Sequence, residues 1–376
     1  MRRVGASILM LLAGCALEER EDPGLVDNGG GLTTPGTATD GGIDTLDATE
    51  EDDETGDIKL DVGEGGSGGP QECQEGQDCP DQCEAMAHVP CDAGTTDVFA
   101  AIGLGCEGEI QITGTTQGDP ASIGIRTGFG ATDTWAPREG SSFAVIGSGS
   151  VAELDSETPP NDPNSVGLTT GPTYCNDDML ASPDPGGTLP APVRVTDVVG
   201  DCTTDETLLG SGDCSRTISG QFSQGGAAFD YAELRIIANV PEGNNSISYD
   251  FAFFSTEYPD YFGGVFNDMY VGWLESESWT GNISFDEQGA PISLNAGFLD
   301  FRDDSASLPE FGGTCMKQHA GTKWLSSTAP VTPGEQITVV LAVFDLADPV
   351  LDSYVFLDNW QWGCDGTGGP VTTPVG

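Results

Sequence analysis

Two acidic segments of the sequence carry residue types that could bind a metal ion. One is SYDFAFFSTEYPDYFGGVFNDMYVGWL (248–274) and the other is FDLADPVLDSYVFLDNWQW (344–362). Calcium takes roughly six to eight oxygen ligands, often carboxylates and amides on loops. A β-sandwich could place these two segments side by side, so we expect calcium here. The predicted ligands are Glu257, Asn267, Asp268, Asp352 and Asp358.

The same acids have a simpler interpretation. Asp and Asn often cap turns and face solvent, and this chain has 61 acidic residues. No Asp-x-Asp-x-Asp-Gly loop of the EF-hand kind is present, so the calcium prediction depends on composition and position alone.

Aromatic residues in and near these segments also have two interpretations. They could stack on sugar rings, or they could pack in the core and rim of a sheet, which is commoner for Trp and Tyr on strands. We favour packing. The residues concerned are Tyr258, Tyr261, Phe262, Trp273, Trp279, Trp324, Trp360 and Trp362.

Enzyme chemistry has little support in the sequence. The chain has only His88 and His319, neither in a recognisable triad, and His319 is expected to be solvated in the polar stretch CMKQHAGTK. The Gly-x-Ser-x-Gly around Ser67 lies in a Gly-rich linker, not at a strand-to-helix turn. Carboxylate pairs can be chosen anywhere in so acidic a chain, so they indicate no glycosidase. We expect no catalytic residues.

The segments that carry these residues have the sequence pattern of β-strands. Short apolar or alternating runs are separated by Gly, Pro, Asn and Asp, which is the all-β pattern, and only 98–106 favours a helix. Both faces of the run 339–344 look buried. We expect a jelly-roll-like β-sandwich with long loops over 95–365, and a turn-rich surface insertion near 155–195. The strand candidates are 141–149, 232–240, 246–255, 269–274, 336–345 and 353–362.

Two stretches carry a resemblance to a known family. FAFFSTEYPDYFGGVFND (251–268) and DSYVFLDN (352–359) resemble the choice-of-anchor L family of bacterial surface domains. Residues 100–106, 124–130 and 136–150 look like its amino-terminal half. The resemblance implies a surface location and a fold rather than an activity. Relatives carry varied carboxy-terminal anchors, and here we expect an amino-terminal lipid instead.

The start of the chain predicts export. Residues 1–14 have a basic start and an apolar stretch too short to span a bilayer, which is typical of a signal peptide. Leu-Ala-Gly-Cys resembles the bacterial lipobox, so we expect a lipid on Cys15, where two or more acyl chains would anchor the chain stably. The alternative is an ordinary secretory signal with a chance Cys. The expected location is the bacterial envelope, at the outer membrane or cell surface.

The segments outside the sandwich are polar. Residues 15–72 are rich in Gly, Thr, Asp and Glu, and cannot bury enough apolar surface to fold, so we expect a disordered acidic stalk. Residues 366–376 are expected to be a disordered tail. A formal charge of −49 excludes nucleic acid and anionic lipid surfaces as partners, and leaves cations, neutral glycans and basic proteins.

The cysteines indicate an oxidising compartment. Ten of the 11 cysteines follow Cys15, an even number that predicts up to five disulfides. Cys79 and Cys83 could belong to a zinc site, but two histidines and the exported context favour bridges. Four cysteines within 73–94 suggest a small bridged segment, and the pairing stays open.

Together these features predict a cell-surface lipoprotein whose β-sandwich is a non-catalytic binding or adhesion module, stabilised by calcium. Its partners would be the membrane, through the lipid, and a glycan or surface protein. The alternative is a structural coat or matrix protein that contacts copies of itself. A carboxylate-dependent hydrolase is the weakest of the three hypotheses.

Overall fold

The computed structural model describes residues 83–375 with internal gaps. The expected signal peptide, Cys15, the stalk and Ser67 all lie outside the described residues, as does most of the amino-terminal part of the insertion. Among the residues that the structure describes, no helix has the length and apolar character needed to cross a membrane. The gaps are residues 84, 157–174, 176–178, 180, 197, 199, 201, 215–216, 305–307 and 367.

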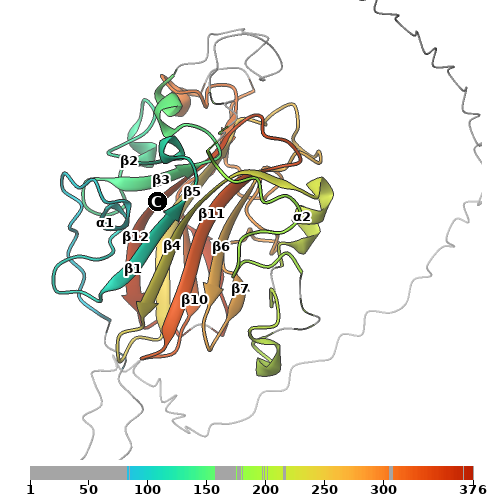
Figure 1. The fold of residues 1–376 in the computed structure, drawn as a ribbon. Helices are drawn as coiled ribbons and strands as arrows, with labels where there is room; N and C mark the ends of the chain where they lie inside the picture. Colours follow the sequence, from blue (N-terminus) through green and yellow to red (C-terminus); the bar gives the residue numbers. More distant parts are fainter. Residues whose placement is uncertain are drawn as a thin grey trace, which may run out of the picture. The chain divides into compact units, whose positions relative to one another are not determined.

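Two antiparallel sheets form a sandwich, which confirms the expected fold class (Figure 1). The first sheet has five strands, in the order β1 (Ile112–Gln117), β4 (Ala228–Asn239), β11 (Gln336–Leu346), β6 (Met269–Glu275) and β7 (Thr280–Asn282). The second has the order β13 (Val371–Pro374), β10 (Leu325–Pro330), β5 (Ser246–Ser255), β12 (Ser353–Gly363), β3 (Phe143–Gly147) and β2 (Ile123–Arg126). Beside β5, it also includes β9 (Ala320–Gly321), which pairs with β8 (Phe301–Arg302).

All six strand candidates correspond to strands of the sandwich, namely β3, β4, β5, β6, β11 and β12. The expected helix is shorter than its sequence pattern, because α1 (Val98–Ala101) stops before the glycines of Gly-Leu-Gly. A second helix, α2 (Ser219–Gly225), was not anticipated; it ends at Gly226, which adopts the left-handed conformation with φ of 75°. Five short 3-10 turns make up the other helical residues in the described part of the chain.

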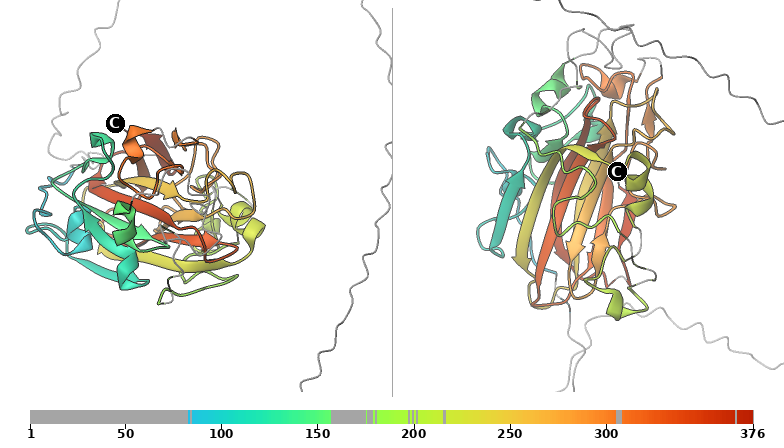
Figure 2. Two further views of the ribbon diagram at one scale, coloured as in Figure 1. Left: turned by 90° about the horizontal axis from the view of Figure 1, so that it is seen from above. Right: turned by 45° about the vertical axis from the view of Figure 1, so that its right-hand side comes forward.

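The inner core lies between the two sheets. Strand alternation sends every second side chain into it, as Val339 and Leu341 of β11 show. Val340 and Phe344 point the other way and join a separate apolar cluster on the outer face of the same sheet. Both faces of this strand are therefore buried, as its sequence predicted. Helix α2 lies beside this sheet (Figure 2). Its Phe222 packs in the same cluster, with its ring 6.1 Å from that of Phe344.

The outer face of the second sheet carries a third cluster, which is rich in aromatic rings. Phe356 of β12 is fully buried there, and its ring centroid lies 4.5 Å from that of Phe254 and 5.0 Å from that of Phe129. Loops and short turns supply the cover, including Trp135, whose indole N–H donates to the Thr322 carbonyl at 3.0 Å. The long loops are thus structural layers, because without them each sheet would expose an apolar face.

Among the described residues there are four disulfides, two of which join cysteines 281 and 140 residues apart, whereas the other two close short loops of 15 and 12 residues. Two of them, Cys83–Cys364 and Cys91–Cys106, join the cysteine-rich segment to the sandwich. The others are Cys175–Cys315 and Cys202–Cys214. The prediction of disulfides is confirmed for these eight cysteines, and Cys73 and Cys79 lie outside the described residues.

The structure corrects the prediction that the tail is disordered. Residues 371–374 form β13, which extends the second sheet by pairing with β10 over Leu325 to Thr328. Little in the sequence indicates this strand, because only its Thr372 is buried. The hydroxyls of Thr372 and Ser327 lie 3.1 Å apart. A strand at the edge of a sheet needs few apolar side chains when backbone pairing holds it.

We predict that Phe356→Ala lowers the free energy of unfolding by about 3–5 kcal/mol, because it opens a cavity among packed rings on the outer face. Denaturant unfolding measures this change. The matched control is Phe262→Ala, in which a side chain that is 42% exposed is removed, and its cost should stay below about 1 kcal/mol. If the two variants lost the same free energy of unfolding, the burial of Phe356 in an outer layer would be contradicted.

Candidate functional site

The fold brings the two acidic segments together at one end of the sandwich. Strand β5 ends where β12 begins, with Ser255 paired to Ser353. Strand β6 begins opposite the end of β11, with Met269 paired to Phe344. Glu257 follows β5, Asp268 precedes β6, and the carboxyl-terminal part of β11 contains Asp345. We call Glu257, Asp268 and Asp345 the carboxylate cluster.

Asp268 connects the two sheets. Its Oδ1 accepts a hydrogen bond from the Leu346 backbone N–H at 3.1 Å, and its Oδ2 accepts one from the Ser353 hydroxyl at 2.7 Å. Leu346 belongs to the first sheet and Ser353 to the second. The Asp268 side chain is 1% exposed. Burial raises its pKa above the ordinary value, although these hydrogen bonds act in the opposite direction.

Asp345 is the most deeply enclosed member of the cluster. It is fully buried and its side chain contacts those of Asp268 and Ser148, but neither carboxylate oxygen has a hydrogen bond of normal geometry. Burial raises its pKa well above the ordinary value, and the neighbouring charges of Asp268 and Asp352 raise it further; the Ser148 hydroxyl counteracts this only in part. A group placed in this way is unstable as an isolated anion.

Glu257 completes the cluster at the start of the loop that follows β5. The residue is 2% exposed, and its Oε2 is buried without a hydrogen-bond partner. Burial raises its pKa, and the Asp268 charge raises it further, while the Asp268 backbone N–H lowers it. The half-buried Asp348 adds a further negative charge to this neighbourhood.

The cluster must hold either protons or a cation. None of the ion pairs that the described residues form includes one of its members. Buried carboxylates without a basic partner are neutralised by protonation or by coordinating a metal. As the side chains stand, no group of three or more His, Cys, Asp or Glu residues in the described part of the chain is arranged around a metal position. A bound ion would require the carboxylates to turn toward one another.

The structure places the other predicted ligands differently. Asp352 lies beside Asp345, and its Oδ2 accepts a hydrogen bond from the Tyr354 hydroxyl at 2.9 Å. Asn267 is buried next to Asp268, but its amide contacts protein groups: Nδ2 donates to Gln221 at 2.8 Å and Oδ1 accepts from the Asn295 N–H at 2.9 Å. Asn267 therefore fixes neighbouring loops.

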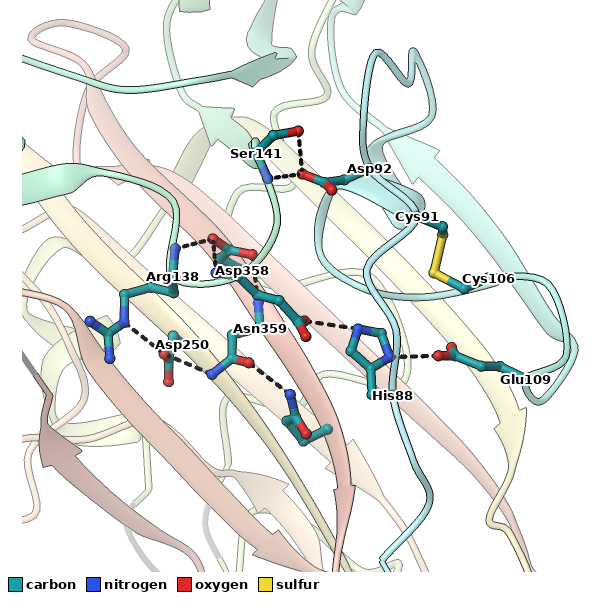
Figure 3. Close-up of polar contacts among 12 residues, drawn as sticks. His88, Cys91, Asp92, Cys106, Glu109, Arg138, Ser141, Asp250, Asp358 and Asn359 are labelled. Carbon is teal, nitrogen blue, oxygen red and sulfur yellow. Dashed lines mark hydrogen bonds and ion pairs between the residues drawn. A yellow bond between two sulfur atoms is a disulfide. The ribbon is translucent and has the colours of Figure 1, made fainter.

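Asp358 does not join the carboxylate cluster, which corrects the expected ligand set. It lies five residues beyond Ser353 along β12, about 16 Å at the rise of an extended strand. Its Oδ2 accepts hydrogen bonds from the backbone N–H groups of Arg138 at 2.6 Å and Glu139 at 3.3 Å (Figure 3). Nearby, the Arg138 Nε lies 3.0 Å from the Asp250 Oδ2. Asp358 thus holds the loop that precedes β3.

His88 lies next to this network and was not anticipated. Its Nδ1 is 2.5 Å from the Glu109 Oε1 and its Nε2 is 2.8 Å from the Glu139 Oε2 (Figure 3). Close by, the Asp92 Oδ2 accepts from the Ser141 N–H at 2.6 Å. These contacts attach the segment after Cys83 to the sandwich, so they have a structural role. No spacing in the sequence links His88 to partners 21 and 51 residues away.

The structure also corrects the prediction that His319 is solvated. The expected solvated histidine is 1% exposed, and its Nδ1 lies 2.6 Å from the Tyr258 carbonyl oxygen. Burial lowers its pKa, so the neutral form is favoured. The imidazole fixes the start of the loop after β5. The polar sequence around His319 concealed this, because the loop folds inward against Tyr258.

The structure separates the aromatic residues into core and surface. The five tryptophans of the expected set are 6% exposed or less, which supports packing over sugar stacking for them. Phe262, by contrast, is 42% exposed, and it lies between Tyr258 and Val265 in the loop after β5. We call residues 258–266 the aromatic loop.

A surface hollow of about 450 Å³ lies beside α2. Its lining contains no acid, histidine or cysteine, and Thr217 supplies its one hydroxyl group. The lining residues are Thr217, Gly220, Gln221, Gln224, Gly289, Ala290 and Pro291.

The family profile of the choice-of-anchor L domain matches residues 237–361. Over this stretch the chain is similar to the choice-of-anchor L family. The match extends from the end of β4 through most of β12, so it includes the first acidic segment, all but the last residue of the second, and the carboxylate cluster. The stretches 100–106, 124–130 and 136–150 lie outside the match. The family indicates a surface-associated β-sandwich domain of bacteria. No curated protein and no solved structure matches the chain.

Asp358 should make stability depend on pH. Burial raises its pKa to about 7, so the folded protein retains a proton that the unfolded chain loses near its ordinary value of 3.8. The free energy of unfolding should therefore fall as pH rises through this window, by up to about 1.4 kcal/mol per pH unit for this group. Asp358→Asn should make that slope shallower in urea unfolding between about pH 5 and pH 6.5. An unchanged slope would contradict the assignment.

Proposed function

We propose that the chain is a non-catalytic binding or adhesion module, tethered to the bacterial envelope by a lipid on Cys15 and stabilised by calcium. The surface-associated domain supports the location. The enclosure of the acidic cluster supports a non-catalytic role, because carboxylates that are 2% exposed or less cannot reach a polymeric substrate. The observation that carries the proposal is the placement of the aromatic loop.

The aromatic loop lies at the opposite end of the sandwich from the point where the amino-terminal segment joins it. Cys83 is bridged to Cys364, directly after the end of β12 at Gly363. The loop follows Ser255, which pairs with Ser353 at the start of the same strand. The 11 residues of β12 separate the two ends by about 35 Å. A tether that enters at one end leaves the other end free for contact.

The loop is held in place by its neighbours. Arg302 lies 4.6 Å from the centre of the Phe262 ring. The side chain of Asn295 accepts a hydrogen bond from the Gly263 N–H at 2.5 Å and donates one to the Gly264 carbonyl at 3.3 Å. Phe262 is 42% exposed and Val265 is 50% exposed. An ordered loop that exposes apolar side chains is suited to binding, because little entropy is lost when a ligand docks.

The charge of the chain narrows the ligand class. A formal charge of −49 repels anionic polymers, so an aromatic surface on this protein suits a neutral glycan. Ring faces supply apolar contact. Asp260 in the loop, and Asp304, which accepts a hydrogen bond from the Tyr258 hydroxyl, can accept hydrogen bonds from sugar hydroxyls. A coat protein would instead bind a second copy of itself, and a hydrolase would turn its ligand over.

We predict that an array of neutral glycans contains ligands for the full chain, and that Phe262→Ala weakens the best interaction at least about tenfold, because a central aromatic contact is lost. Val371→Ala is the control, since this exposed side chain lies on β13, away from the loop. If no glycan on the array is bound and the chain self-associates in solution, the coat-protein hypothesis is favoured over glycan binding.

The tether has its own test. Cys15→Ser should release the chain from the membrane fraction and abolish labelling by radioactive palmitate, because the sulfur carries the lipid. Ala16→Ser is the matched control and should leave both unchanged. A Cys15→Ser chain that stays in the membrane fraction would show that another feature retains it.

A further inference from the structure

We infer that the carboxylate cluster is the calcium site of this protein, that Asp345 is a ligand, and that the bound ion fixes both ends of the aromatic loop. This inference rests on the proposed function, because it locates the calcium named there and uses the same aromatic loop. It keeps Glu257 and Asp268 of the sequence-based set and adds a residue from the apolar strand β11. The predicted ligands left out are Asn267, Asp352 and Asp358. The site would take one divalent cation on oxygen ligands from both sheets.

The observation that favours a bound ion over simple protonation is that several carboxylate oxygens of the cluster lack a hydrogen bond of normal geometry. Both carboxylate oxygens of Asp345 and the Oε2 of Glu257 are buried without a complete hydrogen bond. The two residues are 0% and 2% exposed, so water cannot solvate them from outside. Buried polar atoms are rarely left unpaired, and an unbound ion is one of the accepted reasons for an exception. Both side chains are neighbours of Asp268.

The ligand chemistry selects calcium. Every group in the cluster offers oxygen, and the surrounding hydroxyls of Ser353 and Ser148 offer more of the same. Sulfur or imidazole ligands, which favour zinc and copper, are absent from this set. Calcium tolerates varied numbers and directions of oxygen ligands, whereas magnesium needs near-octahedral geometry. A cluster whose carboxylates must turn to meet the ion fits the more tolerant cation.

The position of the cluster connects the ion to the loop. Glu257 directly precedes the aromatic loop, and Asp268 follows it by two residues. Asp268 is also joined to β11 and β12 through Leu346 and Ser353. An ion shared by Glu257, Asp268 and Asp345 would therefore tie both ends of the loop to the two sheets. Without the ion, repulsion among the three carboxylates works against this closure.

The first test measures thermal unfolding of the full chain after EDTA dialysis and after addition of calcium chloride. Calcium at about a hundredfold above its Kd should raise the wild-type Tm by about 5 °C. Asp345→Asn should lose this rise, while Asp358→Asn, the matched buried acid outside the cluster, should keep it. An absent rise in the wild type, or an equal rise in Asp345→Asn, would overturn the site. If Asp345→Asn does not fold, Glu257→Gln decides the question by the same criterion.

The second test follows the aromatic loop directly. Chymotrypsin cuts after aromatic residues, so cleavage after Tyr261 and Phe262 reports how well the loop is held. Calcium should slow these cuts about tenfold in the wild type and in Asp358→Asn, but not in Asp345→Asn. If calcium leaves the cleavage rate of the wild type unchanged, the claim that the ion holds the aromatic loop is contradicted. Neither test uses a glycan. If the glycan proposal is wrong and the calcium site is right, the chain will respond to calcium but bind no glycan.

Discussion

The constraint that shapes this molecule is the enclosure of three carboxyl groups between two sheets with no basic partner among the described residues. Asp268 alone is well satisfied, through hydrogen bonds to Leu346 and Ser353. Asp345 and Glu257 retain buried oxygens without partners. Burying such groups is costly unless a proton or a cation neutralises them. The end of the sandwich that contains the cluster is therefore the part whose stability depends most on conditions.

The remainder of the architecture makes this enclosure possible. Loops and α2 cover the outer faces of both sheets, so the strands are apolar on both sides and can exclude water near their ends. The disulfide Cys83–Cys364 fixes the opposite end, where the amino-terminal segment joins. The result is a sandwich with two distinct ends. One is braced by a disulfide, and the other is held by a polar cluster and carries the exposed Phe262.

Much of the fold could be predicted from the sequence, because all six strand candidates became strands and the run 339–344 is buried on both faces as expected. The site was only partly predictable. Glu257 and Asp268 stood out in a motif-rich segment, whereas Asp345 reads as the polar end of an apolar strand. Asp358 was misplaced because β12 carries it along the sheet, away from the shared end. The role of His319 depends on how its loop folds inward, which no local pattern records.

The most direct measurement of the central claim is the number of calcium ions bound per chain, determined by equilibrium dialysis of the full chain with radioactive calcium at neutral pH. The account predicts one ion held at the carboxylate cluster, and its loss when Asp345 is replaced by Asn. A chain that binds no calcium would contradict the account, and so would one that keeps the same ion after this replacement. The carboxyl groups would then be neutralised by protons alone.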